Sequence, residues 1–511
     1  MLAKINSFGL NGISGYAVTV EIDISNGLPN TEVVGLPDAA VKESRERVRS
    51  AIANSGYRYS PKKIIINLSP ADTKKTGAMY DLPIAIGILK ATEQFTTQLT
   101  DVAILGELSL DGHVRPVKGI LPIIISALDL GCKKIIIPRA NVIEASYIEG
   151  IDVYGFDTLR DVVAFLSSPE LYTPSPKLDI NKIKEERTYS EDFCQVKGQF
   201  AAKRAMEIAA AGSHNILMIG PPGGGKTMLA RCLPTILPDL TVAEALETTK
   251  IHSVAGVLDE DMGIIVNRPF RAPHHTGSKI ALTGGGISAK PGEISLAHNG
   301  VLFLDELPEF SRTSMEVLRQ PIEDGKITIA RVAATFSYPC SVMLVCAMNP
   351  CPCGYFGHPT RKCTCPKGAP QKYLSRVSGP LLDRLDIHIE VPPVDFDALS
   401  QKEGSEECSS EIKARVNKAR EIQRRRFKGT SVTCNAKMDS ALTRKYCIMT
   451  TAAANILRLS FDKLGLSARA YDKVLRVART IADLDGSDVI DTKHIAEAVQ
   501  YRSLDRKFWK E

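Results

Sequence analysis

The chain has 511 residues, too many for one ordinary domain, and its length predicts about two to four domains. Hydrophobic residues make up 44% and charged residues 24%, an average globular composition that excludes long disordered or fibrous segments. The net charge of +6 permits nucleic acid as a partner without requiring it. No apolar run approaches the roughly 18 residues of a membrane span, and the first residues lack a signal sequence. We therefore expect a cytoplasmic protein with no membrane partner.

The chain divides by pattern into three parts and a linker. Residues 1–168 mix short β-rich runs with helical stretches, which predicts an α+β domain. Residues 169–190 are rich in proline and charge without periodicity, and we interpret them as a linker. Over 191–395 apolar strand-like runs alternate with helical patterns, typical of an α/β domain with a parallel sheet covered by helices. Residues 396–511 carry only helical patterns and predict a helical domain.

The segment GPPGGGKT follows the strand-like run NILMI and precedes the helix-like run TMLARCLPTI. Its glycines let backbone N–H groups surround a phosphate chain, and the helix that follows directs its positive end toward that chain. Lys226 can reach the β- and γ-phosphate oxygens, and Thr227 can ligate Mg²⁺. The spacing predicts a nucleotide-binding loop that consists of Gly220, Pro221, Pro222, Gly223, Gly224, Gly225, Lys226 and Thr227.

Nucleotide hydrolysis also needs a carboxylate for the metal ion and a group that orients water. The run GVLFLDELPEF is an apolar strand that ends on Asp305 and Glu306. We expect Asp305 to hold Mg²⁺ and Glu306 to activate the attacking water. The alternative is a buried strand that simply ends on two solvated acids.

These motifs, with the later runs AMNPCPCG and GPLLDRLDIHIEVP, resemble the Mg-chelatase-like branch of the AAA+ ATPases, and across the whole chain the ComM-type (YifB) competence proteins of bacteria. The resemblance implies ATP and Mg²⁺ as cofactors, an AAA+ core over 191–395 and a helical lid over 396–511. It also implies three more site residues: Asn349 as sensor 1, Arg384 as an arginine finger and Arg469 as sensor 2. An arginine finger acts on the neighbouring subunit, so we expect a ring, and the family implies a hexamer.

Two runs in the first domain, TGAMYDLPIAIGILKA and LGELSLDGHVRPVKGILPIIISAL, resemble the proteolytic domain of Lon-type proteases, whose fold also occurs in modules like ribosomal protein S5. Those enzymes use a serine nucleophile that a lysine activates. Here Asp81 stands at the serine position and Leu121 at the lysine position, although Lys118 lies nearby. We therefore predict a non-proteolytic domain.

Four cysteines form two C-x-C pairs in an insertion over residues 350–366. Four thiolates satisfy tetrahedral Zn²⁺, and a reducing compartment disfavours disulfides. We predict a structural zinc site, with a nearby histidine, His358, as an alternative ligand; a disulfide clip and coincidence remain the other interpretations. The predicted ligands are Cys351, Cys353, Cys363 and Cys365.

Three groups of basic residues are candidates for contact with nucleic acid, and the alternative is an ordinary solvated surface. They are Arg268, Arg271, Lys279 and Lys290 in a glycine-rich insertion, Lys326 and Arg331 in a predicted hairpin, and Arg415, Lys418, Arg420, Arg424, Arg425, Arg426 and Lys428 in one helix. Only Glu411 and Glu421 balance the charges of that helix within its sequence.

We therefore expect an ATP-hydrolysing motor that acts on DNA, and the family resemblance implies a helicase that promotes branch migration in natural transformation and homologous recombination. One alternative is a protein-remodelling ATPase of the Mg-chelatase or MoxR kind. Another is an active ATP-dependent protease, which Asp81 and Leu121 disfavour.

Overall fold

The computed structural model describes residues 2–95, 97, 101–186, 189–259, 261–286, 289–330, 335–394, 406–465, 467–504 and 508. The chain forms two compact units. The first comprises Met1–Glu186, Val242–Val266 and Ala330–Tyr338, and the second comprises Arg187–Thr241, Asn267–Ile329 and Pro339–Glu511. The segment Val242–Val266 thus belongs with the N-terminal residues, although the chain on both sides of it belongs to the second unit.

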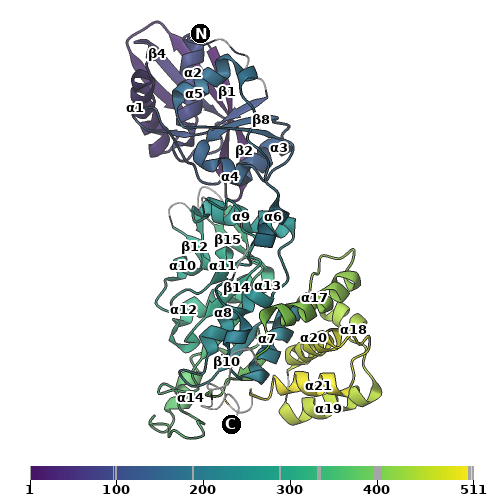
Figure 1. The fold of residues 1–511 in the computed structure, drawn as a ribbon. Helices are drawn as coiled ribbons and strands as arrows, with labels where there is room; N and C mark the ends of the chain where they lie inside the picture. Colours follow the sequence, from purple (N-terminus) through teal and green to yellow (C-terminus); the bar gives the residue numbers. More distant parts are fainter. Residues whose placement is uncertain are drawn as a thin grey trace. The chain divides into compact units, whose positions relative to one another are not determined.

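A seven-stranded mixed sheet in the order β3-β4-β2-β1-β5-β8-β9 forms the centre of the first unit (Figure 1). Side chains alternate across it: Ile136 packs in one hydrophobic cluster, whereas Ile135 and Ile137 pack in another. Both faces are therefore buried. The strands are β1 (Leu2–Asn11), β2 (Ser14–Ser25), β3 (Asn30–Val34), β4 (Lys63–Ser69), β5 (Val102–Ile104), β8 (Lys134–Pro138) and β9 (Asp152–Phe156).

Seven helices accompany this sheet in the described residues, and three of them, α1, α3 and α5, begin at a side-chain cap or a left-handed glycine. Asp38 caps the first helix by accepting from the backbone N–H of Val41 at 2.8 Å, which satisfies a donor that the helix leaves unpaired. The helices are α1 (Ala39–Asn54), α2 (Asp81–Ala91), α3 (Ile120–Asp129), α4 (Val142–Ala145), α5 (Leu159–Ser167), α6 (Ile180–Glu186) and α9 (Val242–Ala255). The expected linker over 169–190 thus contains the helix α6.

The second unit contains a five-stranded sheet in the order β11-β14-β17-β10-β18, and all of its strands are parallel. Ile216 and Met218 pack in the cluster on one face, and Leu217 and Ile219 pack on the other. This sheet confirms the predicted parallel arrangement. Its strands are β10 (Ile216–Ile219), β11 (Phe270–Arg271), β14 (Val301–Leu304), β17 (Met343–Met348) and β18 (Ile387–Glu390).

Short elements surround this sheet together with two longer helices, α7 (Phe200–Gly212) and α8 (Lys226–Ile236). The short helices are α10 (Lys279–Thr283), α11 (Glu293–Leu296), α12 (Arg312–Glu316), α13 (Arg319–Asp324), α14 (Ala369–Leu374) and α15 (Gly379–Leu382). The short strands are β12 (Gly284–Gly285), β13 (Lys290–Pro291) and β15 (Lys326–Ala330), and most of β16 (Thr335–Pro339) belongs to the first unit. As predicted, β15 and β16 form a two-stranded sheet.

The described residues from 406 onward form a helical group without strands (Figure 1, green to yellow). The group shares one hydrophobic core with the helices α7 and α8. The boundary expected at residue 395 lies outside the described residues. The helices are α17 (Ser409–Arg426), α18 (Ser440–Tyr446), α19 (Thr451–Leu464), α20 (Ala468–Leu484) and α21 (Thr492–Gln500).

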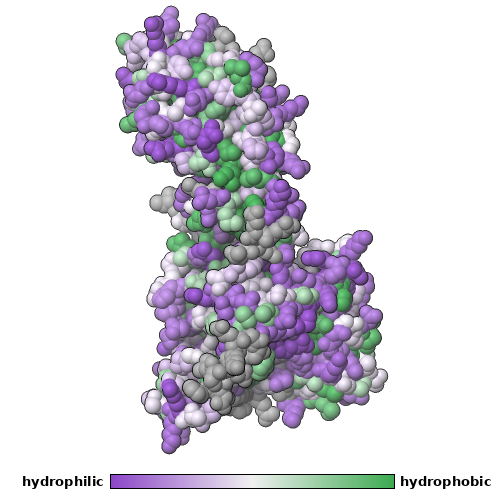
Figure 2. Space-filling view, viewed as in Figure 1, coloured by the Kyte–Doolittle hydropathy of each residue, from purple (hydrophilic) through white to green (hydrophobic). Residues whose placement is uncertain are grey.

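No helix among the described residues is long and apolar enough to cross a bilayer. Figure 2 shows hydrophilic side chains over most of the visible face of each unit. Hydrophobic residues also occur on this face, as is normal for a globular surface.

Candidate nucleotide site and thiol cluster

The phosphate loop begins where β10 ends and leads into α8. Gly220 must be glycine because a Cβ there would lie 2.1 Å from the carbonyl oxygen of Val391. Gly223 and Gly225 have φ values of 77° and 84°, which favour glycine. The loop therefore turns tightly and places its backbone at the N-terminus of α8, which is the arrangement that binds phosphate.

Lys226 is buried in this loop. Its ammonium donates to the carbonyl oxygens of Gly220 at 2.7 Å and Pro221 at 2.9 Å, and to Asn349 Oδ1 at 3.1 Å. Burial lowers the pKa of Lys226, although the nearby carboxylates of Asp305 and Glu306 oppose that shift. The structure thus brings Lys226 and Asn349 together, as the sensor 1 assignment requires.

The two residues predicted to ligate Mg²⁺ are neighbours in space. Thr227 Oγ1 donates to Asp305 Oδ2 at 2.8 Å. Asp305 follows β14 directly, and its other oxygen accepts from the backbone N–H of Glu306 at 2.9 Å. Hydroxyl and carboxylate oxygens are ligands that Mg²⁺ accepts in phosphate sites, so this pair fits the expected ion.

Glu306 has a left-handed backbone with a φ of 51°, an uncommon conformation that costs free energy and is often found at functional sites. Its Oε2 lies 3.3 Å from Nδ1 of His275. The pair of histidines at 274 and 275 is visible in the sequence, but nothing there indicated this partner. A cavity of about 270 Å³ beside the pair is lined by Thr227, Arg231, Phe270, Ala272, Pro273, His274, His275, Phe303, Asp305 and Glu306.

Neither predicted arginine pairs with the phosphate loop of its own chain among the described residues. Arg384 follows α15, binds Glu323 at 2.6 Å and donates to the carbonyl oxygen of Pro380 at 2.6 Å. Its buried Nε has no hydrogen-bond partner in the described part of the chain. Arg469 is exposed as the second residue of α20.

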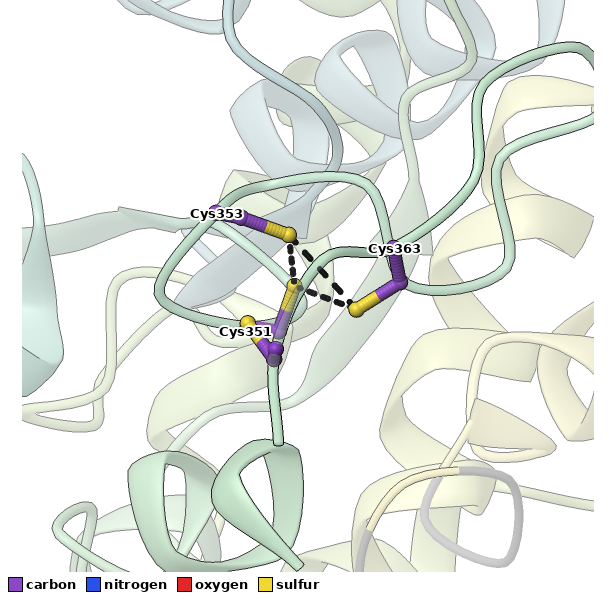
Figure 3. Close-up of side chains that lie close together, drawn as sticks. Cys351, Cys353 and Cys363 are labelled. Carbon is purple, nitrogen blue, oxygen red and sulfur yellow. Dashed lines mark hydrogen bonds between the residues drawn. The ribbon is translucent and has the colours of Figure 1, made fainter. Parts of the chain in front are cut away.

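The four cysteines of the insertion gather at one point. Figure 3 shows the sulfur atoms of Cys351, Cys353 and Cys363 directed toward one another, at separations of 3.4, 3.8 and 3.5 Å. Cys365 joins them, since all four sulfur atoms lie within 4.8 Å of one another. A tetrahedron with Zn–S bonds of about 2.3 Å has S–S edges of roughly 3.8 Å. The spacing fits one zinc ion, and it is too long for a disulfide bond.

The thiols of the cluster differ in acidity: burial and the neighbouring Cys353 raise the pKa of Cys351 to about 12, whereas the surroundings favour loss of a proton at Cys353. Burial raises the pKa of this thiol, but hydrogen bonds from the backbone N–H groups of Tyr355 and Thr364 and from neighbouring thiols outweigh burial and lower it to about 5. His358 does not belong to the cluster, because its Nδ1 accepts from the backbone N–H groups of Thr360 at 3.2 Å and Arg361 at 3.0 Å. The group of possible ligands in the described residues therefore consists of the four cysteines without His358.

Two arginines of the glycine-rich insertion make contacts within the chain that stabilise the fold. Arg268 donates to the carbonyl oxygen of Asn299 at 2.6 Å, and Arg271 forms a bidentate pair with Glu293 at 2.6 and 2.8 Å. Lys279 and Lys290 are exposed. Of the two basic residues predicted in the hairpin, Lys326 is also exposed, and Arg331 lies outside the described residues.

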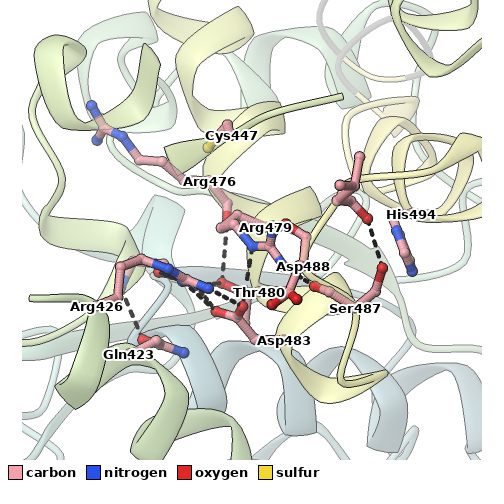
Figure 4. Close-up of polar contacts among 12 residues, drawn as sticks. Gln423, Arg426, Cys447, Arg476, Arg479, Thr480, Asp483, Ser487, Asp488 and His494 are labelled. Carbon is pink, nitrogen blue, oxygen red and sulfur yellow. Dashed lines mark hydrogen bonds and ion pairs between the residues drawn. The ribbon is translucent and has the colours of Figure 1, made fainter. Parts of the chain in front are cut away.

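The helix α17 is less basic at its surface than its sequence indicates. Arg415 binds Glu407 at 3.0 Å and also contacts Glu207. Arg426 donates to Asp483 at 2.7 Å, and Figure 4 shows Arg426 and Arg479 both directed at that carboxylate. The prediction that only Glu411 and Glu421 balance this helix is wrong, because these carboxylates approach it from other segments.

Asp81 and Leu121 are both buried. Asp81 accepts from Arg47 Nε at 2.8 Å and from Ser44 Oγ, so its carboxylate holds α1 against α2. Leu121 packs in a hydrophobic cluster. Neither side chain has the chemistry of the protease residue expected at its position.

Lys118 lies beside the segment Val242–Val266 of the first unit. It lines a cavity with Glu144 and Ser253. The Ser253 hydroxyl donates to the buried Glu144 carboxyl group, whose pKa burial raises. Tyr147 also donates, to the carbonyl oxygen of Met262 at 2.8 Å. These contacts fasten the segment to the N-terminal residues.

Comparison with protein families identifies the class. Residues 192–399 match the family described as magnesium chelatase, subunit ChlI, residues 20–141 match subunit ChlI of Mg-chelatase, and residues 406–502 match the C-terminal part of subunit ChlI. The chain is a Mg-chelatase-like AAA+ protein, a class whose fold implies ATP and Mg²⁺.

Full-length relatives define the family more narrowly. The chain is 46% identical to YifB of Escherichia coli over 99% of its length and 98% of that protein. It is 43% identical to competence protein ComM of Haemophilus influenzae, which it matches over 100% of its length and 99% of that protein. It is also 28% identical to Lon protease 2 of Bacillus subtilis over 33% of its length and 34% of that protein. The chain belongs to the ComM/YifB family.

The ion pairs of α17 lead to a prediction about stability. The side chains of Arg426 and Asp483 are 12% and 0% exposed, and in Arg426→Ala the buried carboxylate keeps only Arg479 and Asn435 as partners. We expect a loss of about 1.5–3 kcal/mol in the free energy of unfolding, measured as a lower midpoint in chemical denaturation. Arg425→Ala is the matched control, since Arg425 is 78% exposed and its pair with Glu421 contributes little. Equal midpoints for the two variants would contradict the structural role of Arg426.

Proposed function

We propose that this protein is a ring-forming ATPase of the cytoplasm that acts on DNA, as a helicase that promotes branch migration during natural transformation and homologous recombination. The observation that carries ATP hydrolysis is the convergence of Lys226, Thr227, Asp305 and Asn349 at one edge of the parallel sheet. The family implies the two cofactors, ATP and Mg²⁺.

Each side chain has a distinct task in this proposal. Lys226 exchanges its loop carbonyl partners for phosphate oxygens, and Asn349 orients both Lys226 and the attacking water. Thr227 and Asp305 hold Mg²⁺, which when bound neutralises phosphate charge. Glu306 accepts a proton from the attacking water.

The ring is proposed from Arg384 and from the family. Within its own chain Arg384 binds Glu323, and its buried Nε has no partner among the residues that the structure describes. An arginine that reaches a neighbouring γ-phosphate stabilises the charge of the transition state. We infer that Arg384 leaves Glu323 for the neighbouring subunit, that the ring is a hexamer, and that Arg469 of α20 couples the position of the helical group to the bound nucleotide.

DNA is the favoured substrate for two reasons. The relative from Haemophilus influenzae is named a competence protein, and competence is the uptake of DNA by bacteria. The second unit also exposes Lys279, Lys290, Lys362 and Lys367, which suit phosphate contacts.

A protein-remodelling ATPase is the second candidate. It is favoured by the ion pairs that neutralise Arg415 and Arg426, because they reduce the basic surface of α17 that is available to nucleic acid. It is also favoured by the match of three segments to magnesium chelatase subunit ChlI. Proteolysis is disfavoured, since Asp81 and Leu121 cannot act as nucleophile and base.

We predict that DNA stimulates ATP hydrolysis. The purified protein is assayed alone, with single-stranded DNA, with a four-way junction and with an unfolded protein, and the last arm is also examined for cleavage. Glu306→Gln removes the general base and is expected to lower the rate at least about 100-fold. The matched control is Glu309→Gln, a neighbouring carboxylate that pairs with Arg376 and is not part of the proposed site.

The outcomes separate the candidates. Stimulation by DNA that is lost in Glu306→Gln and kept in Glu309→Gln supports the proposal. Stimulation by unfolded protein alone favours the remodelling ATPase. Cleavage of the unfolded protein would overturn the non-proteolytic assignment.

We also propose that Cys351, Cys353, Cys363 and Cys365 bind one structural zinc ion. The support is the tetrahedral spacing of the four sulfur atoms, since four cysteine sulfurs in that arrangement bind zinc. Residues 350–366 contain no helix or strand, so a metal would replace the stability that regular structure does not supply.

Metal analysis tests this site. We expect about one zinc ion per chain, and Cys353→Ser is expected to lower that content because it removes one of four ligands. Cys132→Ser is the control, since Cys132 is half-buried in the first unit and outside the cluster. Wild-type protein that is metal-free and fully active would contradict the site.

A further inference from the structure

A turn of the thiol cluster lies directly against the phosphate loop. Gly354 follows Cys353 and has a φ of 82°. A Cβ at this glycine would lie 2.5 Å from Cδ and 3.1 Å from Cγ of Pro222. No side chain fits at that distance, so the backbone of Gly354 packs on the ring of Pro222, the third residue of the phosphate loop.

The same segment is attached to the phosphate loop at two further points. The backbone N–H of Gly220 donates to the carbonyl oxygen of Met348 at 3.2 Å, and Lys226 donates to Asn349 at 3.1 Å. Two residues later the chain reaches Cys351, the buried member of the cluster. The route from the thiols to the nucleotide site is therefore only a few residues long.

The cluster fixes the position of the turn. The backbone N–H of Gly354 donates to the carbonyl oxygen of Cys351 at 2.9 Å, and that of Phe356 donates to Cys351 Sγ at 3.3 Å. Gly354 is thus held by Cys351 and Cys353 on one side and by the ring of Pro222 on the other. Because packed interiors do not deform continuously, a shift of this turn must move Pro222 or open a gap beside it.

We propose that the metal-loaded thiol cluster positions the phosphate loop through the contact between Gly354 and Pro222, so that loss of the metal weakens nucleotide binding. This inference rests on the zinc site proposed above. Without a metal the segment over residues 350–366 regains conformational freedom, and the free energy of ordering it opposes nucleotide binding. Gly354 and Cys353 act in this account as positioning residues, since neither reaches the nucleotide-binding side chains directly.

The insertion contains a matched control for this contact. Gly357 lies three residues further on and has a φ of 76°, yet a Cβ there would meet nothing within 4 Å. An alanine at either glycine carries the same strain of a positive φ. Only Gly354→Ala also presses on Pro222.

The experiment measures the affinity of Gly354→Ala, Gly357→Ala and wild type for a fluorescent ADP analogue, with the zinc content of the same preparations. Crowding of a packed contact typically costs enough to lower affinity about tenfold. We expect that loss in Gly354→Ala, with zinc retained, and a change of less than about twofold in Gly357→Ala. Equal losses in both variants, or none in Gly354→Ala, would overturn the role of the contact.

A second arm needs no substitution and therefore does not depend on how the variants fold. Zinc is released from wild-type protein with a thiol-reactive mercurial and a chelator, and nucleotide affinity is measured before and after. We expect affinity to fall as zinc leaves and to recover when the thiols are freed and zinc is restored. Unchanged affinity after zinc release would overturn the inference and leave the zinc site intact. If wild-type protein contains no zinc as purified, the proposed metal site is wrong, and so is the proposed dependence of nucleotide affinity on the metal.

Discussion

The parallel pairing of β10, β14 and β17 is the constraint on which the candidate site depends. Ile219 pairs with Met348, and Leu304 pairs with Cys346, so three adjacent strands end at the same edge of the sheet. The phosphate loop, Asp305 and Asn349 each begin at one of those ends. A shift of one residue in any pairing would turn alternate side chains to the opposite face and separate these groups. Burial of both faces of the sheet fixes this register.

Site motifs whose residues lie within a few positions of a strand end could be predicted from the sequence. The phosphate loop, the pair at 305 and 306, and the two C-x-C motifs carry their chemistry in contiguous residues, and the strand before each loop indicates where it lies. The parallel sheet of the second unit could also be predicted, because apolar strand-like runs that alternate with helical patterns are typical of such a sheet.

Features that depend on distant partners could not be predicted. The charges of α17 appear unbalanced in sequence, but Glu207 and Asp483 approach it from helices that are 208 and 57 residues away along the chain. The ion pair of Arg384 with Glu323, and the contact of His275 with Glu306, are hidden in the same way. Side-chain pairing between separate elements follows from the tertiary arrangement, which no local pattern contains.

The segment Val242–Val266 makes the first unit depend on residues that lie within the sequence of the second, which a linear map of domains conceals. Ser253 donates a hydrogen bond to the buried carboxyl group of Glu144. A fragment that ends at Glu186 would lack Ser253, and this carboxyl group would lose that hydrogen bond. The chain also passes between the units several times, so no single cut separates them. Such units cannot be exchanged between proteins as independent modules, and recombination within this gene would preserve them only when both are inherited together.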